Sequence, residues 1–139
     1  MNFLLDTCVL SELVKPQPEP KVVQWVGDRD EYRLFLSVVT IGELHKGVAK
    51  LPHGPRRTGL ESWVARDLTA RFDKRILPVD IRVAAAWGVM LGEAEAKGSP
   101  LPVVDALISA TASVHGCVVV TRNVADFERT GIEVEDPWC

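Results

Sequence analysis

The sequence NFLLDTCVLSEL, residues 2–13, places three consecutive apolar residues before a single carboxylate, Asp6, and a helix-forming segment. A contiguous apolar run is typical of a strand buried on both faces of a parallel sheet. We therefore expect a strand over residues 2–6 and a helix over residues 10–15. Asp6 would then lie at the carboxyl end of a strand, where α/β sheets bind their ligands. Asp is also a common N-cap, so the residue alone does not decide between these two roles.

The remaining segments repeat this alternation of strand and helix. Apolar runs and helical spacings predict strands at 33–38, 75–80, 117–121 and 131–136 and helices at 21–28, 40–51, 60–74, 81–97 and 103–114. The proline-rich segment 15–21 and the polar segment 53–59 are expected to be loops. A chain of 139 residues has the size of one domain. The sequence therefore predicts a single domain over residues 1–139, an α/β/α three-layer sandwich with a mostly parallel central sheet.

Composition excludes several classes of protein. With 47% hydrophobic and 25% charged residues, the chain is unlike disordered or fibrous sequences. No apolar run approaches the roughly 20 residues of a membrane helix, and the first residues carry no secretion signal, so we expect a cytoplasmic protein without a membrane segment. Cys8, Cys117 and Cys139 form an odd set without Cys-x-x-Cys spacing, which argues against disulfides and structural zinc.

The net charge of -3 provides no general attraction to nucleic acid, so binding to RNA or DNA would need local basic residues or a metal ion. Basic residues gather in the middle of the chain, at Lys46, Lys50, Arg56, Arg57, Arg66, Arg71, Lys74 and Arg75. Acidic residues interleave with several of them, so an ordinary solvated helix surface is the alternative use of about half of them.

Two further carboxylates lie in apolar surroundings. Asp105 falls near the start of a predicted helix, where the helix dipole favours negative charge, yet valines precede it and apolar residues follow it. Glu43 lies inside the predicted helix 40–51, where an exposed glutamate is the plain alternative. If Asp6, Glu43 and Asp105 meet at one edge of the sheet, their repulsion raises their pKa values unless a cation neutralises them.

A divalent cation bound by oxygen atoms is the economical partner for such a cluster. Carboxylates select Mg²⁺ or Mn²⁺, ions that retain several waters and also bind substrate phosphate. His45, His53 and His115 show no zinc-binding spacing. The acids therefore indicate metal-assisted hydrolysis of a phosphodiester, in which the ion polarises the phosphate and lowers the pKa of the attacking water.

Four segments resemble, in their order and spacing, the PIN-domain ribonucleases, and specifically the VapC-type toxins of bacterial toxin–antitoxin modules. They are LLDTCVLSEL at 4–13, SVVTIGEL at 37–44, VVDALISATA at 103–112 and VVTRNVADF at 119–127. The resemblance implies a Rossmann-like α/β/α fold and Mg²⁺-dependent cleavage of RNA. It also implies inhibition by a cognate VapB-type antitoxin, a homodimer, and a toxin–antitoxin hetero-oligomer that binds promoter DNA through the antitoxin.

The resemblance also assigns roles to individual residues. Asp6, Glu43 and Asp105 become the metal-binding and catalytic acids, while Thr7 and Thr121 become supporting hydroxyl residues. Our hypothesis is that Asp6 and Asp105 bind Mg²⁺ directly, whereas Glu43 binds it through water or orients the attacking water. Thr7 or Thr121 would then hold water or phosphate by a hydrogen bond. The family implies products with 5′-phosphate and 3′-hydroxyl ends.

The chain departs from the family pattern at two positions. Cys8 stands where Asn or Ser is frequent, and nothing in the sequence explains the thiol. Asn123 stands where many members have a fourth acid. Asp126, three residues later, is a candidate to supply that charge through one helical turn, with a plain surface position as the alternative.

Three other classes of protein fit parts of this pattern. A phosphatase with an aspartyl nucleophile would need a second Asp at position 8, which is Cys8. A phosphoacceptor receiver domain could use Asp80, which otherwise caps a helix, but it gives Glu43 and Asp105 no role. The strongest alternative is a non-catalytic PIN-like module that acts with a DNA-binding partner, because it keeps the fold without the cleavage.

Overall fold

Five parallel strands lie in the order β3-β2-β1-β4-β5 in the computed structural model, which describes residues 1–139. They are β1 (Asn2–Leu5), β2 (Leu34–Ser37), β3 (Ile76–Leu77), β4 (Cys117–Val120) and β5 (Val134–Glu135). Central β1 pairs Phe3 with Leu34 of β2 and Leu5 with Val120 of β4. All predicted strands are therefore present, although those expected at 75–80 and 131–136 are each reduced to 2 residues.

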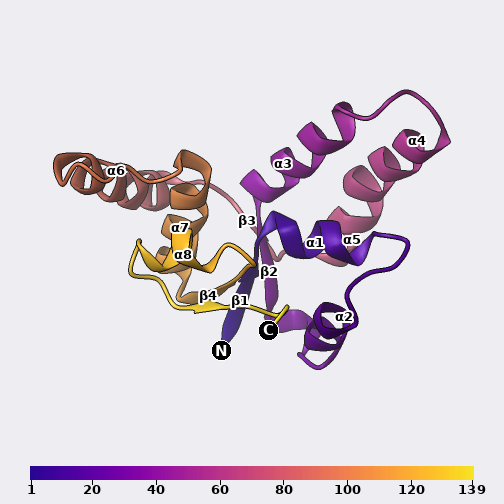
Figure 1. The fold of residues 1–139 in the computed structure, drawn as a ribbon, viewed down its shortest axis with the longest axis horizontal. Helices are drawn as coiled ribbons and strands as arrows, with labels where there is room; N and C mark the ends of the chain where they lie inside the picture. Colours follow the sequence, from indigo (N-terminus) through magenta and orange to yellow (C-terminus); the bar gives the residue numbers. More distant parts are fainter.

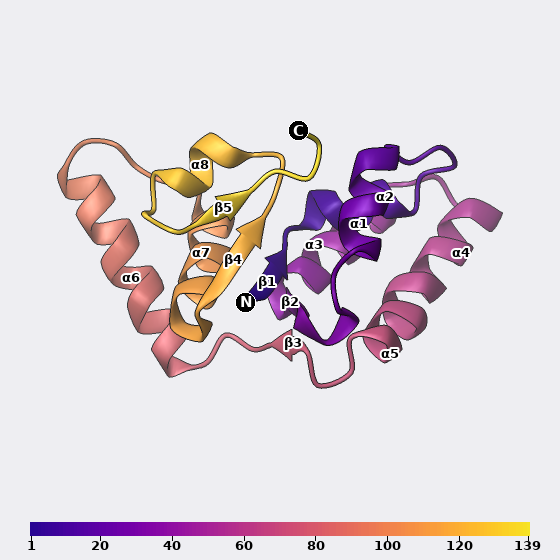
Figure 2. The ribbon, with the colours of Figure 1, turned by 90° about the horizontal axis from the view of Figure 1, so that it is seen from below.

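The helices are α1 (Thr7–Leu13), α2 (Pro20–Gly27), η1 (Glu31–Arg33), α3 (Val38–Ala49), α4 (Pro55–Ser62), η2 (Trp63–Leu68), α5 (Thr69–Arg71), α6 (Ile81–Ala96), α7 (Val103–His115) and α8 (Val124–Glu128). Figure 1 shows α3 and α4 rising on one side of the sheet and α6 projecting on the other. Seen from below in Figure 2, α6, α7 and α8 stay on one side, and α1 to α5 stay on the other.

Strand side chains alternate between two apolar clusters, which is why both faces of the sheet are covered. Phe3 and Leu5 of β1 belong to the larger cluster, which α1, α2, α3 and η2 complete. Leu4, between them, belongs to the smaller cluster with Ile108 of α7 and Phe127 of α8. Successive residues of a strand point to opposite faces, so one contiguous apolar run fills both cores. The predicted three-layer α/β/α sandwich with a parallel sheet is confirmed.

Local signals at helix ends agree with the predictions. Asp80 caps α6, since its Oδ1 accepts a hydrogen bond from the Val83 backbone N–H over 3.0 Å. Gly116 ends α7 in the left-handed conformation with φ 66°, which glycine adopts without steric cost. The structure therefore gives Asp80 the capping role that the sequence left as its alternative.

The prediction of a loop over residues 53–59 and one helix over 60–74 is wrong. α4 begins at Pro55, a position in the first helical turn where proline is tolerated. A turn of π-helix, η2, then separates α4 from α5. No residue of α4 is fully buried, so this helix lacks the apolar periodicity on which the prediction depended.

The longest helix, α6, has 16 residues. It falls short of the length needed to cross a bilayer, and none of the other helices combines the required length and apolarity.

Candidate active site

The carboxyl ends of β1 and β4 bring Asp6 and Thr121 together. The backbone N–H of Asp6 donates to the carbonyl of Val120 over 2.9 Å, which extends the pairing of the two strands by one step. The Thr121 hydroxyl then donates to Oδ2 of Asp6 over 2.8 Å. Both residues are buried, with Asp6 only 4% exposed. The parallel sheet therefore joins residues 115 positions apart in the chain.

Asp6 uses its two carboxylate oxygens differently. Oδ1 accepts the backbone N–H of Thr7 over 2.8 Å at the start of α1, so the capping role is present. Oδ2 accepts the Thr121 hydroxyl instead. One carboxylate thus caps a helix with one oxygen and reaches the candidate site with the other, and the two roles considered for it are compatible.

Cys8 lies against the same oxygen. Its Sγ is 3.6 Å from Oδ2 of Asp6 and 3.6 Å from Oγ1 of Thr121. Burial, followed by the negative charge of Asp6, raises the pKa of the Cys8 thiol to about 11. Cys8 is therefore a neutral thiol near neutral pH, suited to donating a weak hydrogen bond and not to acting as a nucleophile.

Glu43 enters the site from α3, which follows the neighbouring strand β2. Ser37 caps this helix, accepting the Val39 backbone N–H over 3.0 Å. The hydroxyl of Thr7 donates to Oε1 of Glu43 over 2.5 Å and joins α1 to α3. This pairing was not predicted, because no local sequence pattern relates residues 36 positions apart. Thr7 therefore orients a carboxylate, whereas our hypothesis was that Thr7 or Thr121 holds water or phosphate.

Asp105 lies in the first turn of α7, half-buried and facing the other acids. Burial, and after it the negative charges of Asp6, Asp126 and Glu43, raise the pKa of its carboxyl to about 6. No cationic side chain offsets these effects. The acids predicted from separate segments therefore lie close enough to repel one another, and the site attracts positive charge.

Asp126 and Asn123 occupy different places at the rim. Asp126 lies in the first turn of the short helix α8, half-buried, and its charge acts on Asp105. Asn123 is exposed, and its backbone N–H donates to Oγ1 of Thr121 over 3.0 Å. The negative charge therefore comes from Asp126 through one helical turn, while Asn123 orients Thr121 through its main chain.

The donor atoms fit a hydrated divalent ion. No three His, Cys, Asp or Glu side chains converge closely enough to bind one ion directly. Mg²⁺ commonly uses one or two carboxylates and keeps several waters, so a site of this kind does not need three direct protein ligands. Burial is the largest cause of the raised pKa of Asp105, and the negative charges of Asp6, Asp126 and Glu43 add to it; a bound cation would offset these charges.

The three histidines stay outside this arrangement. His45 and His53 are exposed, and His115 ends α7 beside the opposite end of β4. The oxygen-rich acidic centre therefore has no imidazole ligand.

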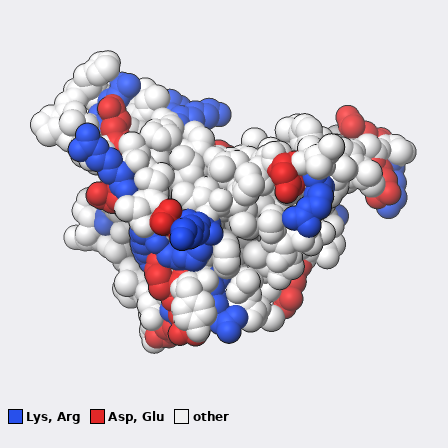
Figure 3. Space-filling model, turned by 180° about the vertical axis from the view of Figure 1, so that it is seen from behind, with Lys and Arg blue, Asp and Glu red and all other residues white.

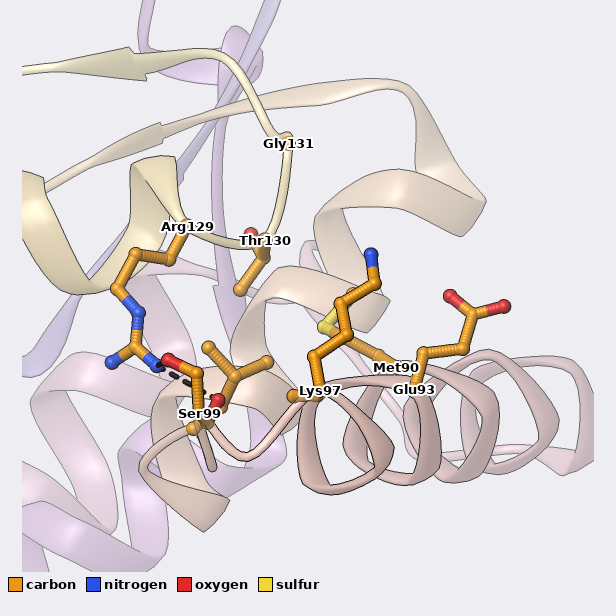
Figure 4. Close-up of a pocket in the computed structure, with 9 residues that line it drawn as sticks. Met90, Glu93, Lys97, Ser99, Arg129, Thr130 and Gly131 are labelled. Carbon is orange, nitrogen blue, oxygen red and sulfur yellow. Dashed lines mark hydrogen bonds between the residues drawn. The ribbon is translucent and has the colours of Figure 1, made fainter.

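A cavity of about 420 Å³, away from the acids, lies between α6 and the turn after α8 (Figure 4). Beside it, Nη2 of Arg129 donates to the Ser99 carbonyl over 2.9 Å, to Ser99 Oγ over 2.8 Å and to the Pro100 carbonyl over 3.0 Å. These bonds tie the end of α8 to the loop before α7. Glu93 is the acid at this cavity, and none of Asp6, Glu43, Asp105 and Asp126 lines it.

The basic residues of the middle segment divide into two groups. Arg71 holds Glu31 through two 2.9 Å hydrogen bonds, Arg75 also pairs with Glu31, and Arg57 pairs with Glu61 over 2.8 Å. The rear view in Figure 3 shows positive side chains interleaved with negative ones, below a hollow between two arms. Arg56 forms no ion pair and borders, with Lys15, a cavity of about 270 Å³ that Thr7 and Glu43 also line.

The PIN domain family matches residues 3–133, and the chain belongs to this family. One relative is the VapC ribonuclease Y4jK of Sinorhizobium fredii, 33% identical over 98% of this chain and 97% of the relative. Toxin FitB of Neisseria gonorrhoeae is 36% identical over 98% of each chain. The tRNA(fMet)-specific endonuclease VapC of Salmonella typhimurium is 30% identical over 100% of this chain and 99% of the relative.

Solved structures agree with this assignment. FitAB bound to an IR36 DNA fragment contains a chain with a TM-score of 0.91 and 34% identity, over 99% of this chain and 96% of that one. DNA-bound VapBC from Salmonella typhimurium contains one with a TM-score of 0.79 and 30% identity, over 100% and 99% of the two chains. The fold and the family predicted from the sequence motifs are confirmed.

Proposed function

We propose that this chain is a VapC-type endoribonuclease toxin that hydrolyses RNA phosphodiester bonds with a bound Mg²⁺ or Mn²⁺. The observation that carries the proposal is the surroundings of Asp105, where burial, and after it the negative charges of Asp6, Asp126 and Glu43, raise the pKa of the carboxyl to about 6. Full-length relatives named as ribonucleases and as a tRNA-specific endonuclease support the same chemistry.

The side chains divide the work. Asp6 and Asp105 would hold the ion, and Glu43, which Thr7 orients, would bind it through water or position the attacking water. Thr121 keeps Asp6 in one orientation and adds a hydroxyl at the edge of the site. When bound, the ion supplies Lewis-acid polarisation of the phosphate and lowers the pKa of the attacking water. Asp126 adds negative charge that strengthens cation binding.

A cognate VapB-type antitoxin inhibits the enzyme in this proposal. The related solved structures are a FitAB complex and a VapBC complex, each bound to DNA. We accordingly infer a homodimer that joins the antitoxin in a hetero-oligomer and reaches promoter DNA through the antitoxin. The proposed activity is cytoplasmic.

The second candidate function is that of a non-catalytic module that acts with a DNA-binding partner. The DNA-bound complexes among the related structures favour it. It differs from the first proposal in one respect, because it requires no metal-dependent cleavage of RNA.

RNA cleavage by the purified protein separates the two functions. Total RNA is incubated with the parent chain in Mg²⁺, in EDTA, and with the variants Asp6→Asn and Asp73→Asn. Asp73 is an exposed acid in the turn after Phe72 and serves as the matched control. We expect Mg²⁺-dependent fragments with 5′-phosphate ends from the parent and from Asp73→Asn, and none from Asp6→Asn.

Two outcomes count against the ribonuclease. Cleavage in EDTA, or equal cleavage by Asp6→Asn, would indicate a contaminant or a different chemistry. Intact RNA in every reaction, together with unchanged thermal unfolding and antitoxin binding, would favour the non-catalytic module.

A further inference from the structure

Arg122 follows Thr121 at the carboxyl end of β4, and the structure gives its side chain an unusual environment. The side chain is exposed and makes no ion pair or hydrogen bond. Its guanidinium carbon instead lies 5.3 Å from the centre of the Trp138 ring. At this distance the ring attracts the cation through its π-face, while the N–H groups at the edge of the guanidinium stay available.

Trp138 is a fixed support for this arginine. Its ring packs against the larger apolar cluster, and its backbone N–H donates to Oδ1 of Asp136 over 2.8 Å. An arginine held in place before a ligand arrives loses less freedom on binding than a free one. Trp138 therefore holds the Arg122 guanidinium in a position where it can bind an anion.

A cavity of about 420 Å³ adjoins the pair, and its wall consists of Glu12, Gln17, Pro18, Glu19, Pro20, Arg122 and Trp138. Its two acids already have other partners. Glu12 accepts Lys15 Nζ and the Glu19 backbone N–H, both over 3.0 Å, and Glu19 accepts the Lys21 backbone N–H over 3.4 Å. Arg122 thus remains a cation without an anionic partner.

The backbone of Arg122 lies beside the candidate active site, next to the residues that bond to Asp6. Thr121, the preceding residue, donates to Asp6, and the backbone N–H of Asn123, the following residue, donates to Thr121. Four carboxylates at this edge repel a polyanion, so an RNA chain needs positive charges beside them to remain bound. Arg122 follows Thr121 at this edge of the sheet, and its guanidinium lies over the Trp138 ring.

We propose that Arg122, held against Trp138, binds a backbone phosphate of the RNA next to the one that is cleaved. Guanidinium and phosphate form paired, charge-assisted hydrogen bonds, which suits a group whose face is occupied and whose edge is free. Trp138 is a positioning residue in this arrangement, because it acts on RNA only through Arg122. The inference rests on the proposed RNA substrate, and its test must be independent of cleavage.

RNA binding without turnover provides that test. All proteins carry Asp105→Asn and are kept in EDTA, and fluorescence anisotropy follows a short labelled single-stranded RNA over a series of salt concentrations. The variants add Arg122→Gln, Arg122→Lys or Trp138→Leu. Arg33→Gln is the matched control, because Arg33 also lies over an aromatic ring, 5.5 Å from the centre of Tyr32, but at the opposite end of the strands.

We expect Arg122→Gln to weaken RNA binding about tenfold at low salt. The slope of log K against log salt should fall by about 0.7, the contribution of one phosphate contact on a single strand. Arg122→Lys and Trp138→Leu keep the charge, so they should keep most of the slope while losing part of the affinity. Arg33→Gln should change neither quantity.

An unchanged slope and affinity in Arg122→Gln would overturn the inference, and so would an equal loss in Arg33→Gln. Thermal unfolding of each variant excludes a folding defect, and Arg122→Lys keeps the test valid if Trp138→Leu does not fold. Failure of the ribonuclease proposal has a different signature, namely an Arg122-dependent salt slope in a protein whose parent leaves RNA intact in Mg²⁺.

Discussion

Thr121 donates a hydrogen bond to Oδ2 of Asp6 over 2.8 Å, so the ends of two neighbouring strands are joined inside the proposed metal site. The other oxygen of Asp6 accepts the Thr7 backbone N–H over 2.8 Å. These two bonds fix the orientation of the carboxylate before any ion arrives. A ligand held in this way needs little reorganisation to bind metal.

Replacement of Thr121 by valine should show how much the Thr121–Asp6 hydrogen bond contributes to stability. Thr121→Val keeps the shape but leaves a buried carboxylate oxygen with one partner fewer, at a cost of about 1 to 3 kcal/mol of unfolding free energy. Urea unfolding measures the loss. Thr58→Val is the control, since the exposed Thr58 hydroxyl bonds only to the Gly54 carbonyl. Equal effects of the two variants would remove the special role of the Thr121–Asp6 bond.

Asp105 predicts a pH dependence of the metal-free protein. Its folded pKa of about 6 lies above the ordinary value of 3.8, so the group favours folding at low pH and that contribution is lost as pH rises through about 6. In EDTA, Asp105→Asn should therefore be more stable than the parent at about pH 7.5, and the advantage should shrink by about pH 5. Urea unfolding of both proteins at the two pH values checks the sign. A constant difference would contradict the raised pKa.

Mg²⁺ binding should offset the destabilisation that ionised Asp105 causes in the metal-free protein. Mg²⁺ binds the folded state alone, so it should raise the melting temperature of the parent, with about 2.7 kcal/mol of stabilisation at a hundred times the dissociation constant. Asp6→Asn and Asp105→Asn should lose most of the shift. Differential scanning calorimetry with Mg²⁺, using Asp73→Asn as the control, measures it. A similar shift in all four proteins would mean that the ion binds elsewhere.

Cys8 should be the unreactive thiol that its surroundings indicate. The pKa of about 11 and the partial burial keep it protonated at neutral pH. Cys139 is exposed, whereas Cys117 is buried. A thiol reagent followed by peptide mass analysis should modify Cys139 first and Cys8 only on unfolding. Rapid modification of Cys8 in the folded protein would show that the thiol is more accessible than its packing against Asp6 and Thr121 allows.

Sequence patterns predicted the parts of this molecule that depend on local packing. The apolar runs of β1 and β4 predict strands buried on both faces. The alternation of such strands with helices along the chain predicts the α/β/α sandwich. α4 was not predicted because none of its residues is buried, so its sequence shows no apolar periodicity. Long-range pairs such as Thr7 with Glu43 have no local signature at all.

The candidate site was predicted for a different reason. Position at a strand end left the role of Asp6 open between helix cap and site acid. The structure shows the cap at Oδ1 and a separate bond from Thr121 at Oδ2, so the two roles are compatible. The convergence of Asp105 with Asp6 depends on the sheet order, which spacing alone does not determine; the family motifs supplied it. Asp126 shows the limit of motif matching, because its charge reaches Asp105 from a position three residues beyond the expected one.

The rate of cleavage of a labelled single-stranded RNA, measured against Mg²⁺ concentration for the parent and for Asp105→Asn, tests the central claim most directly. The account predicts a saturable, Mg²⁺-dependent rate for the parent. Asp105→Asn should be slower by about a hundredfold or more, since metal-ion catalysis supplies several kcal/mol. Equal rates for the two proteins, or a parent rate that persists in EDTA, would contradict the assignment of these acids to a metal-dependent active site.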